Sequence, residues 1–260
     1  MRRPRFLSPP LLSTLALAVL LPAGAAAQSN SESNGERIAN DRYTRSHDYD
    51  LVHQRIEIRN VSWDSTSFDG RVATTLVSRR PAMDSVVLDA GALLDIQRVT
   101  GPRGVVLRAD HRGDTLVVRL PTSAAFGDTV RFTIAYHARI RSGAGLTFIE
   151  PEGRPHRPRQ LWSQGEDTNN HLWFPTYDFP NDKMTWELSA TVPTALTVVS
   201  NGRLVSDRRV GHGQHTVRWS QRKPAPTYLV SLVIGSLHRV HDSWHGIPVD
   251  YYVYPEDSAL

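Results

Sequence analysis

The stretch MTWELSATV, residues Met184 to Val192, decides the fold class of this chain. Apolar side chains occupy every second position of the stretch, and polar side chains occupy the positions between them. Successive side chains of an extended chain point to opposite faces, so this period gathers the apolar groups on one face. Residues 130–137, with the sequence VRFTIAYH, alternate in the same way. Both segments are therefore predicted to be half-buried β-strands.

Strand and turn signals of the same kind continue along the chain. Glycine-bearing segments at 101–104, 201–202 and 211–213 predict turns between antiparallel strands. No segment sustains a 3.6-residue period over the length of a helix. We therefore predict an all-β fold, a twisted sandwich-like arrangement of antiparallel or mixed sheets with at most short helices. The other predicted strands are Leu51–Arg59, Phe68–Val77, Ser85–Leu88, Val105–Arg108, Thr115–Leu120, Leu196–Val199, His215–Trp219, Tyr228–Ile234 and Pro248–Tyr254.

The amino-terminal 27 residues have the order of an export signal. Three early arginines precede an apolar run from Leu11 to Leu21 and a small-residue end, Ala25-Ala26-Ala27. A membrane anchor is the alternative, but a spanning helix needs about 20 apolar residues, and this run is shorter and is followed by Pro22. We predict a signal peptide over 1–27 cleaved near Ala27, a flexible lead-in over 28–47 and one domain over 48–260. The expected location is extracytoplasmic, periplasmic or secreted, with no membrane anchor after cleavage.

Charge and cysteine content exclude several classes of protein. Without Arg2, Arg3 and Arg5, the 30 Lys and Arg residues fall to 27 against 26 Asp and Glu. A nearly neutral chain has no broad basic surface, so no nucleic-acid partner is predicted. The absence of cysteine excludes a disulfide framework and a thiolate metal site. Stability must therefore come from a hydrophobic core.

Between the predicted strands lies one long stretch, WSQGEDTNNHLWFPTYDFPNDKMTW, residues Trp162 to Trp186. Gln164 and Glu166 flank Gly165, and a glycine free to adopt positive φ would place the amide and the carboxylate side by side, a pair suited to an ammonium group. The polar residues 167–171 predict one short helical turn that ends before Pro175. A structural corner whose polar groups are all satisfied is the competing interpretation, because Asp and Pro are common in turns.

This ordered pattern of a Gln-Gly-Glu step, Phe174-Pro175, Asp178-x-Pro180, Lys183 and an alternating strand resembles the amino-terminal domain of the M1 family of zinc aminopeptidases, the aminopeptidase N and leukotriene A4 hydrolase group. The resemblance covers about residues 48 to 254 and includes Tyr49-Asp50-Leu51, Gly143-Ala144-Gly145-Leu146, Ser200-Asn201-Gly202 and, as a last core strand, residues 227–230. It implies that Gln164 and Glu166 bind the substrate, with the acidic residue holding the free α-amine of a peptide.

The chain also departs from the family pattern. Asn169, Asn170 and Thr176 stand where many members have an Arg after the acidic step and a Cys in the Phe-Pro segment. The family's zinc-binding His-Glu-x-x-His helix and catalytic Tyr belong downstream of Leu260. The resemblance therefore implies no catalytic residue, no metal ligand and no cofactor in this fragment, zinc in a complete family member, and two partners: a peptide amino terminus and a downstream zinc catalytic domain.

The chain's own histidines do not form a zinc motif. None of them is followed by Glu, whereas a metalloprotease helix carries His-Glu-x-x-His. His238, His241 and His245 have a helix-compatible spacing, but their surroundings indicate a strand, on which His238 and His241 would face opposite ways.

The sequence thus predicts the substrate-recognition domain of an exported M1-like zinc aminopeptidase, a fragment without the zinc-binding domain. The alternative is a secreted, non-catalytic β-sandwich module that binds glycans or proteins through rings such as Trp162 and Trp173.

Overall fold

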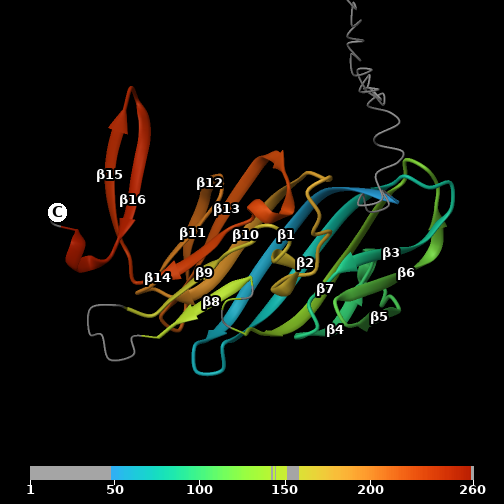
Figure 1. Ribbon diagram of the computed structural model, residues 1–260, viewed down its shortest axis with the longest axis horizontal. Helices are drawn as coiled ribbons and strands as arrows, with labels where there is room; N and C mark the ends of the chain where they lie inside the picture. Colours follow the sequence, from blue (N-terminus) through green and yellow to red (C-terminus); the bar gives the residue numbers. More distant parts are fainter. Residues whose placement is uncertain (1–47, 142, 144, 151–157, 259–260) are drawn as a thin grey trace, which may run out of the picture. The chain divides into compact units, whose positions relative to one another are not determined.

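The computed structural model describes residues 48–141, 143, 145–150 and 158–258, and Figure 1 shows their arrangement. The predicted signal peptide (1–27) and the predicted lead-in (28–47) both lie outside the described residues. Within the described part, every helix is a single 3-10 turn: η1 (Pro102–Gly104), η2 (Asn170–Leu172), η3 (Thr227–Leu229) and η4 (Pro255–Asp257). None of the described helices is long and apolar enough to cross a membrane. The predicted all-β class is confirmed.

The largest sheet has seven strands, and Figure 1 shows how they lie side by side. Its neighbours pair antiparallel except β1 and β10, which pair parallel from His53↔Thr185 to Ile58↔Ala190. The sheet is therefore mixed. In spatial order its strands are β12 (Arg203–Gly211), β13 (Gln214–Ala225), β10 (Met184–Pro193), β1 (Tyr49–Ser62), β2 (Ser67–Ser78), β7 (Thr129–Arg139) and β4 (Leu94–Thr100).

Three smaller sheets accompany it. A four-stranded sheet has the order β11 (Thr197–Ser200), β14 (Leu232–Gly235), β9 (Gln160–Ser163) and β8 (Leu146–Ile149). A three-stranded sheet has the order β3 (Met83–Asp89), β6 (Thr115–Ala124) and β5 (Ala109–Arg112). Strands β15 (His238–Trp244) and β16 (Ile247–Val253) form a separate hairpin.

The core lies on one face of the large sheet, where the strand register lines up the apolar side chains. Leu188, Ile56, Val72 and Ile134 form one row across β10, β1, β2 and β7, and each is fully buried. These residues belong to one continuous apolar cluster with buried residues of the three-stranded and four-stranded sheets, such as Val86 and Leu232. The alternation read in MTWELSATV therefore corresponds to a real core face.

Two strand predictions are wrong. The run Tyr228–Ile234 begins in the 3-10 turn η3, and only Leu232–Gly235 form a strand. Leu229, the last residue of that turn, is 45% exposed. Val105–Arg108 lies between η1 and β5 and contributes only an isolated bridge between Thr100 and Val106.

Candidate functional site

The candidate site is the loop that leaves β9 at Ser163 and reaches β10 at Met184. Its aromatic part is anchored in the core: Trp173 and Phe174 are fully buried and pack edge to face, with ring centroids 4.5 Å apart. The Tyr136 hydroxyl donates a hydrogen bond of 3.0 Å to the Trp173 carbonyl. Burial raises the pKa of Tyr136, so this phenol stays a donor. The loop is therefore a fixed part of the domain.

Gln164 and Glu166 lie at the exposed start of the loop, on either side of the buried Gly165. Within the described part of the chain, neither side chain has a hydrogen-bond or ion-pair partner, and no hydrogen bond joins the two. The Gln164 N–H donates to the Gly145 carbonyl at 2.8 Å, which ties the loop to the glycine-rich segment before β8. A carboxylate and an amide oxygen that have no partner can each accept a hydrogen bond from an ammonium group.

Gly165 is required for a reason other than the one expected from the sequence. It is not among the glycines with positive φ, so the expected positive-φ step is wrong. Instead, a Cβ at Gly165 would lie 2.3 Å from the Tyr228 carbonyl oxygen and 2.6 Å from Asn170 Nδ2. The glycine lets the loop backbone pack against η3 (Thr227–Leu229), and Gln164 and Glu166 are presented from that contact.

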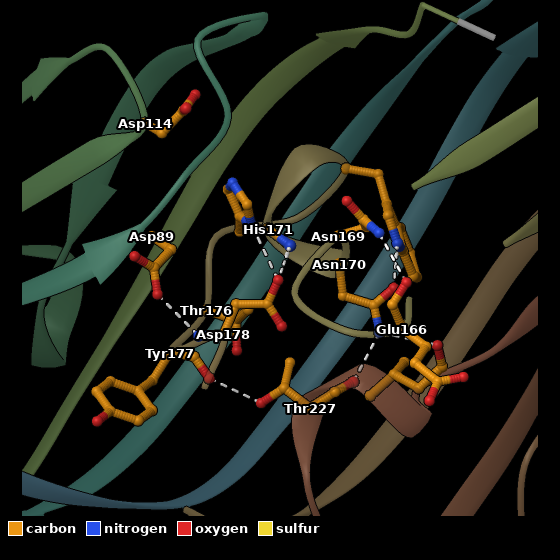
Figure 2. A network of polar contacts seen from close by, with 12 residues as sticks. Asp89, Asp114, Glu166, Asn169, Asn170, His171, Thr176, Tyr177, Asp178 and Thr227 are labelled. Atoms are coloured by element: carbon orange, nitrogen blue, oxygen red, sulfur yellow. Dashed lines mark hydrogen bonds and ion pairs between the residues drawn. The ribbon is translucent and has the colours of Figure 1, made fainter. Parts of the chain in front are cut away.

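Two asparagines hold this backbone. The Asn169 N–H donates to the Gly165 carbonyl at 2.9 Å, and Asn169 Nδ2 donates to the Glu166 carbonyl at 2.8 Å. Asn170 is fully buried, and its Nδ2 donates to the Thr227 carbonyl at 2.6 Å and to the Val230 carbonyl at 3.0 Å. Its Oδ1 accepts from Trp173 Nε1 at 2.7 Å. Figure 2 shows these contacts around Glu166.

Thr176, a second departure from the family pattern, is also buried and satisfied. Its Oγ1 donates to Gln54 Oε1 at 2.8 Å. Gln54 Nε2 then donates to Thr74 Oγ1 and to the Pro175 carbonyl, each at 3.1 Å. The threonine therefore joins the loop to β1 and β2 by hydrogen bonds, which a cysteine would make only weakly.

His171 and Asp178 close the middle of the loop (Figure 2). Asp178 Oδ2 accepts from the His171 backbone N–H and lies 2.9 Å from both that nitrogen and Nδ1 of the ring, while the Asp178 N–H donates to Asp89 Oδ2 at 2.8 Å. Burial by itself would lower the pKa of His171, but the hydrogen bond and charge of Asp178, with the charges of Asp89 and Asp114, outweigh it and raise the pKa. The raised pKa favours the protonated imidazole beside an Asp178 side chain that is only 1% exposed.

Metal ligation is not what this arrangement provides. Among the residues that the structure describes, no group of three or more His, Asp or Glu side chains is placed to hold a metal ion. His238 and His241 lie on β15, which confirms the predicted strand, and His241 Nδ1 lies 2.7 Å from Asp250 Oδ1. A hollow of about 570 Å³ lies elsewhere, between β11, the β12–β13 pair and the base of the β15–β16 hairpin, and it shares no residue with the loop.

Sequence reasoning proposed Gln164 and Glu166 as site residues, which stays a prediction, and it missed the side chains that hold the backbone beneath them. In the sequence, Asn170 stood out only as a departure from the family pattern within a polar helical turn, and no role was assigned to His171 or Asp178. One signal could have found Asn170. Its amide lies two residues before the apolar run Leu172-Trp173-Phe174, which is expected to be buried, and a buried amide needs hydrogen-bond partners. Trp173, one of the two rings assigned to a glycan-binding module, is 0% exposed, so it offers no face to a sugar.

The chain matches the model of the peptidase M1 N-terminal domain over residues 45–229. It is 27% identical over 128 residues to aminopeptidase B of Rattus norvegicus, a match that covers 49% of this chain and 19% of that protein. It is 24% identical over 191 residues to aminopeptidase N of Acetobacter pasteurianus, covering 73% of this chain and 54% of that protein. The chain thus spans between about a fifth and about half of the length of these relatives.

Solved structures show the same fold. An M1 zinc metallopeptidase from Deinococcus radiodurans superposes with a TM-score of 0.65 at 22% identity, covering 76% of this chain and 44% of that one. A two-domain M1 zinc metallopeptidase bound to L-arginine gives a TM-score of 0.66 at 21% identity, covering 80% of this chain and 48% of that one.

Proposed function

Because the chain belongs to the M1 peptidase family, whose N-terminal domain it contains, we propose that it recognises the free α-amine of a peptide for an M1 zinc aminopeptidase. Glu166 is the anchor in this proposal, and Gln164 assists it. The catalytic zinc domain that would cleave the first peptide bond is a further part of the proposal, as is export of the protein.

The main support for the proposal is that Glu166 is exposed and, among the described residues, unpaired on a backbone that is held in place. Its carboxylate is exposed and has no partner within the described part of the chain, although the backbone beneath it is fixed by Asn169 and by the packing of Gly165 on η3. Because its backbone is already held, the loop loses little further freedom when the carboxylate binds a ligand, which favours recognition. An ammonium group is the matching ligand, because it supplies three donors and a positive charge.

Zinc does not fit the described residues, since none of their His, Asp and Glu side chains forms a group of three that could hold an ion. The curated relatives are named as aminopeptidases and the solved ones as M1 zinc metallopeptidases. We therefore assign zinc, and the hydrolysis that it supports, to a separate catalytic domain. The role of this domain is to fix the amino terminus of the peptide, which contributes through orientation.

The test is the substitution Glu166→Ala in the complete natural chain. A charge-assisted hydrogen bond is worth about 1.5–3 kcal/mol, and leaving one charge of a sheltered pair alone costs roughly 2–5 kcal/mol. At about 1.4 kcal/mol per decade, kcat/KM for peptides with a free amino terminus should fall about ten- to a thousandfold. Gln164→Ala should cost less, because a neutral amide loses no ion pair.

Asp167→Ala is the matched control, since Asp167 is an exposed carboxylate next to Glu166. Each variant is assayed on free and N-acetylated peptides while thermal unfolding is followed. We expect Glu166→Ala alone to abolish the preference for a free amine without a change in Tm. A Glu166→Ala enzyme that keeps its preference would refute the assignment, and a parallel loss of Tm and activity would instead favour the structural-corner interpretation.

A further inference from the structure

We propose that Asn170 is the positioning residue for the Glu166 carboxylate, because it clamps the start of the loop onto η3. This inference rests on the proposed function for its enzymatic consequence, but the clamp itself can be tested without catalysis.

The Asn170 amide is saturated by contacts to three separate groups. Both hydrogens of its Nδ2 are donated to backbone carbonyls, those of Thr227 at 2.6 Å and Val230 at 3.0 Å. These carbonyls belong to the first residue of η3 and to the residue after it. The Oδ1 atom accepts from Trp173 Nε1. Only an amide of this length offers two donors on one side and an acceptor on the other, so the side chain joins η3 to the buried aromatic anchor.

The same amide is the surface against which Gly165 packs. Its Nδ2 and Cγ atoms, together with the Tyr228 carbonyl, occupy the space where a Gly165 side chain would begin. Glu166 follows immediately, and its own carbonyl is held by Asn169. The backbone that carries the carboxylate is therefore enclosed between η3, Asn170 and Asn169, with no hydrogen bond to the Glu166 side chain itself.

Thr227 also ties η3 to a second point of the same loop. Thr227 Oγ1 donates to the Tyr177 carbonyl at 2.8 Å, so η3 bridges the Asn170 end and the Tyr177 end of the loop (Figure 2). If Asn170 loses its donors, the Tyr177 contact still holds η3 in place, and the loosened part is confined to residues 164–169. Because the two contacts are separate, we expect the loss of the Asn170 donors to displace Glu166 without unfolding the domain.

Asn170→Asp tests the clamp, because it keeps the shape and the acceptor for Trp173 but replaces both donors with an oxygen that faces two carbonyls. Asn181→Ala is the control: Asn181 is a half-buried amide of the same loop that accepts from the Tyr177 hydroxyl, and among the described residues it forms no hydrogen bond with Gly165 or Glu166. If Asn170→Asp does not fold, Gly165→Ala attacks the same contact from the opposite side, through its Cβ at 2.6 Å from Asn170 Nδ2.

Two measurements are made on each variant in the complete natural chain. The first is amide hydrogen exchange at Asn169, whose N–H is bonded to the Gly165 carbonyl; we expect about tenfold or faster exchange in Asn170→Asp, equivalent to roughly 1.4 kcal/mol of lost protection. The second is the ratio of kcat/KM for free over N-acetylated peptides. A displacement of about 1 Å at a binding group can cost about a hundredfold, so the ratio should fall about ten- to a hundredfold.

The outcomes separate the two proposals. If Glu166→Ala lowers the ratio and Asn170→Asp leaves both the ratio and the exchange unchanged, Asn170 is not a positioning residue. If Glu166→Ala leaves the ratio unchanged but Asn170→Asp speeds exchange at Asn169, the clamp exists and the proposed function is wrong. In the Glu166→Ala background, Asn170→Asp should lower the ratio no further, whereas an additive loss would show that Asn170 acts by another route.

Discussion

At the scale of single residues, His171 makes loop stability depend on pH. Burial alone would lower its pKa, but Asp178, Asp89 and Asp114 raise it above the ordinary 6.5. Such a histidine adds stability that is fully present below its unfolded-state pKa and is lost as pH rises through the folded-state pKa. We therefore expect His171→Gln to destabilise the protein by about 1.5–3 kcal/mol at pH 5.5 and by less at pH 9, measured by urea unfolding.

His53 supplies a control of opposite sign. Burial, the largest cause, lowers its pKa; Glu187 raises it and Arg55 lowers it further, and the net pKa is lowered. Stability from a neutral histidine is lost as pH falls, so His53→Gln should cost less at pH 5.5 than at pH 9. An equal cost of His171→Gln at both values would contradict the role given to its charge.

Single residues also differ in how far their roles could be predicted from the sequence. Gln164 and Glu166 could be proposed as site residues because their spacing around a glycine is a local pattern. Asn170 makes its contacts 57 and 60 positions away, and nothing local reveals such partners. Thr176 likewise finds Gln54 at a separation of 122 residues. Local chemistry predicts which side chains can bind, whereas the supports beneath them are set by tertiary packing.

At the scale of elements, the β15–β16 hairpin should open more easily than any strand of the large sheet. It pairs with no other described strand, and Trp244, Ile247 and Tyr251 are 65%, 57% and 52% exposed. An isolated two-stranded hairpin is at best marginally stable in water. We expect its amides to exchange far faster than those of β1 and β2, by native-state hydrogen exchange. Equal protection of Val240 and Ile56 would show that the hairpin is covered.

Strands with strict alternation were predictable and others were not. β10, β7 and β2 bury every second residue along most of their length, so their sequences carry the period. β12 is almost wholly exposed, and its run Arg203–Gly211 has no apolar period to detect. β8 and β9 have four residues each, too few to establish any period.

At the scale of the whole molecule, the amino-terminal residues predict a processed, exported protein. The order of three arginines, an apolar run and Ala25-Ala26-Ala27 is that of a cleavable signal. We expect the exported product to begin at Gln28, as determined by intact-mass measurement. A soluble product in the cytoplasm that retains Met1 would overturn this prediction.

The parallel pairing of β1 with β10 could not be predicted from the sequence, because alternation shows which side chains share a face of a strand but not which strand lies beside it. It also sets the order in which the domain can be completed. β1 is the fourth of seven strands, and its partner residues lie about 130 positions further along the chain. Non-local pairing slows folding, because the entropy of closing a long loop is lost before the contacts form. Until Met184–Pro193 has left the ribosome, β1 has an open edge. Such an edge can pair with other chains, so the newly made protein needs protection from aggregation until the chain has passed that point.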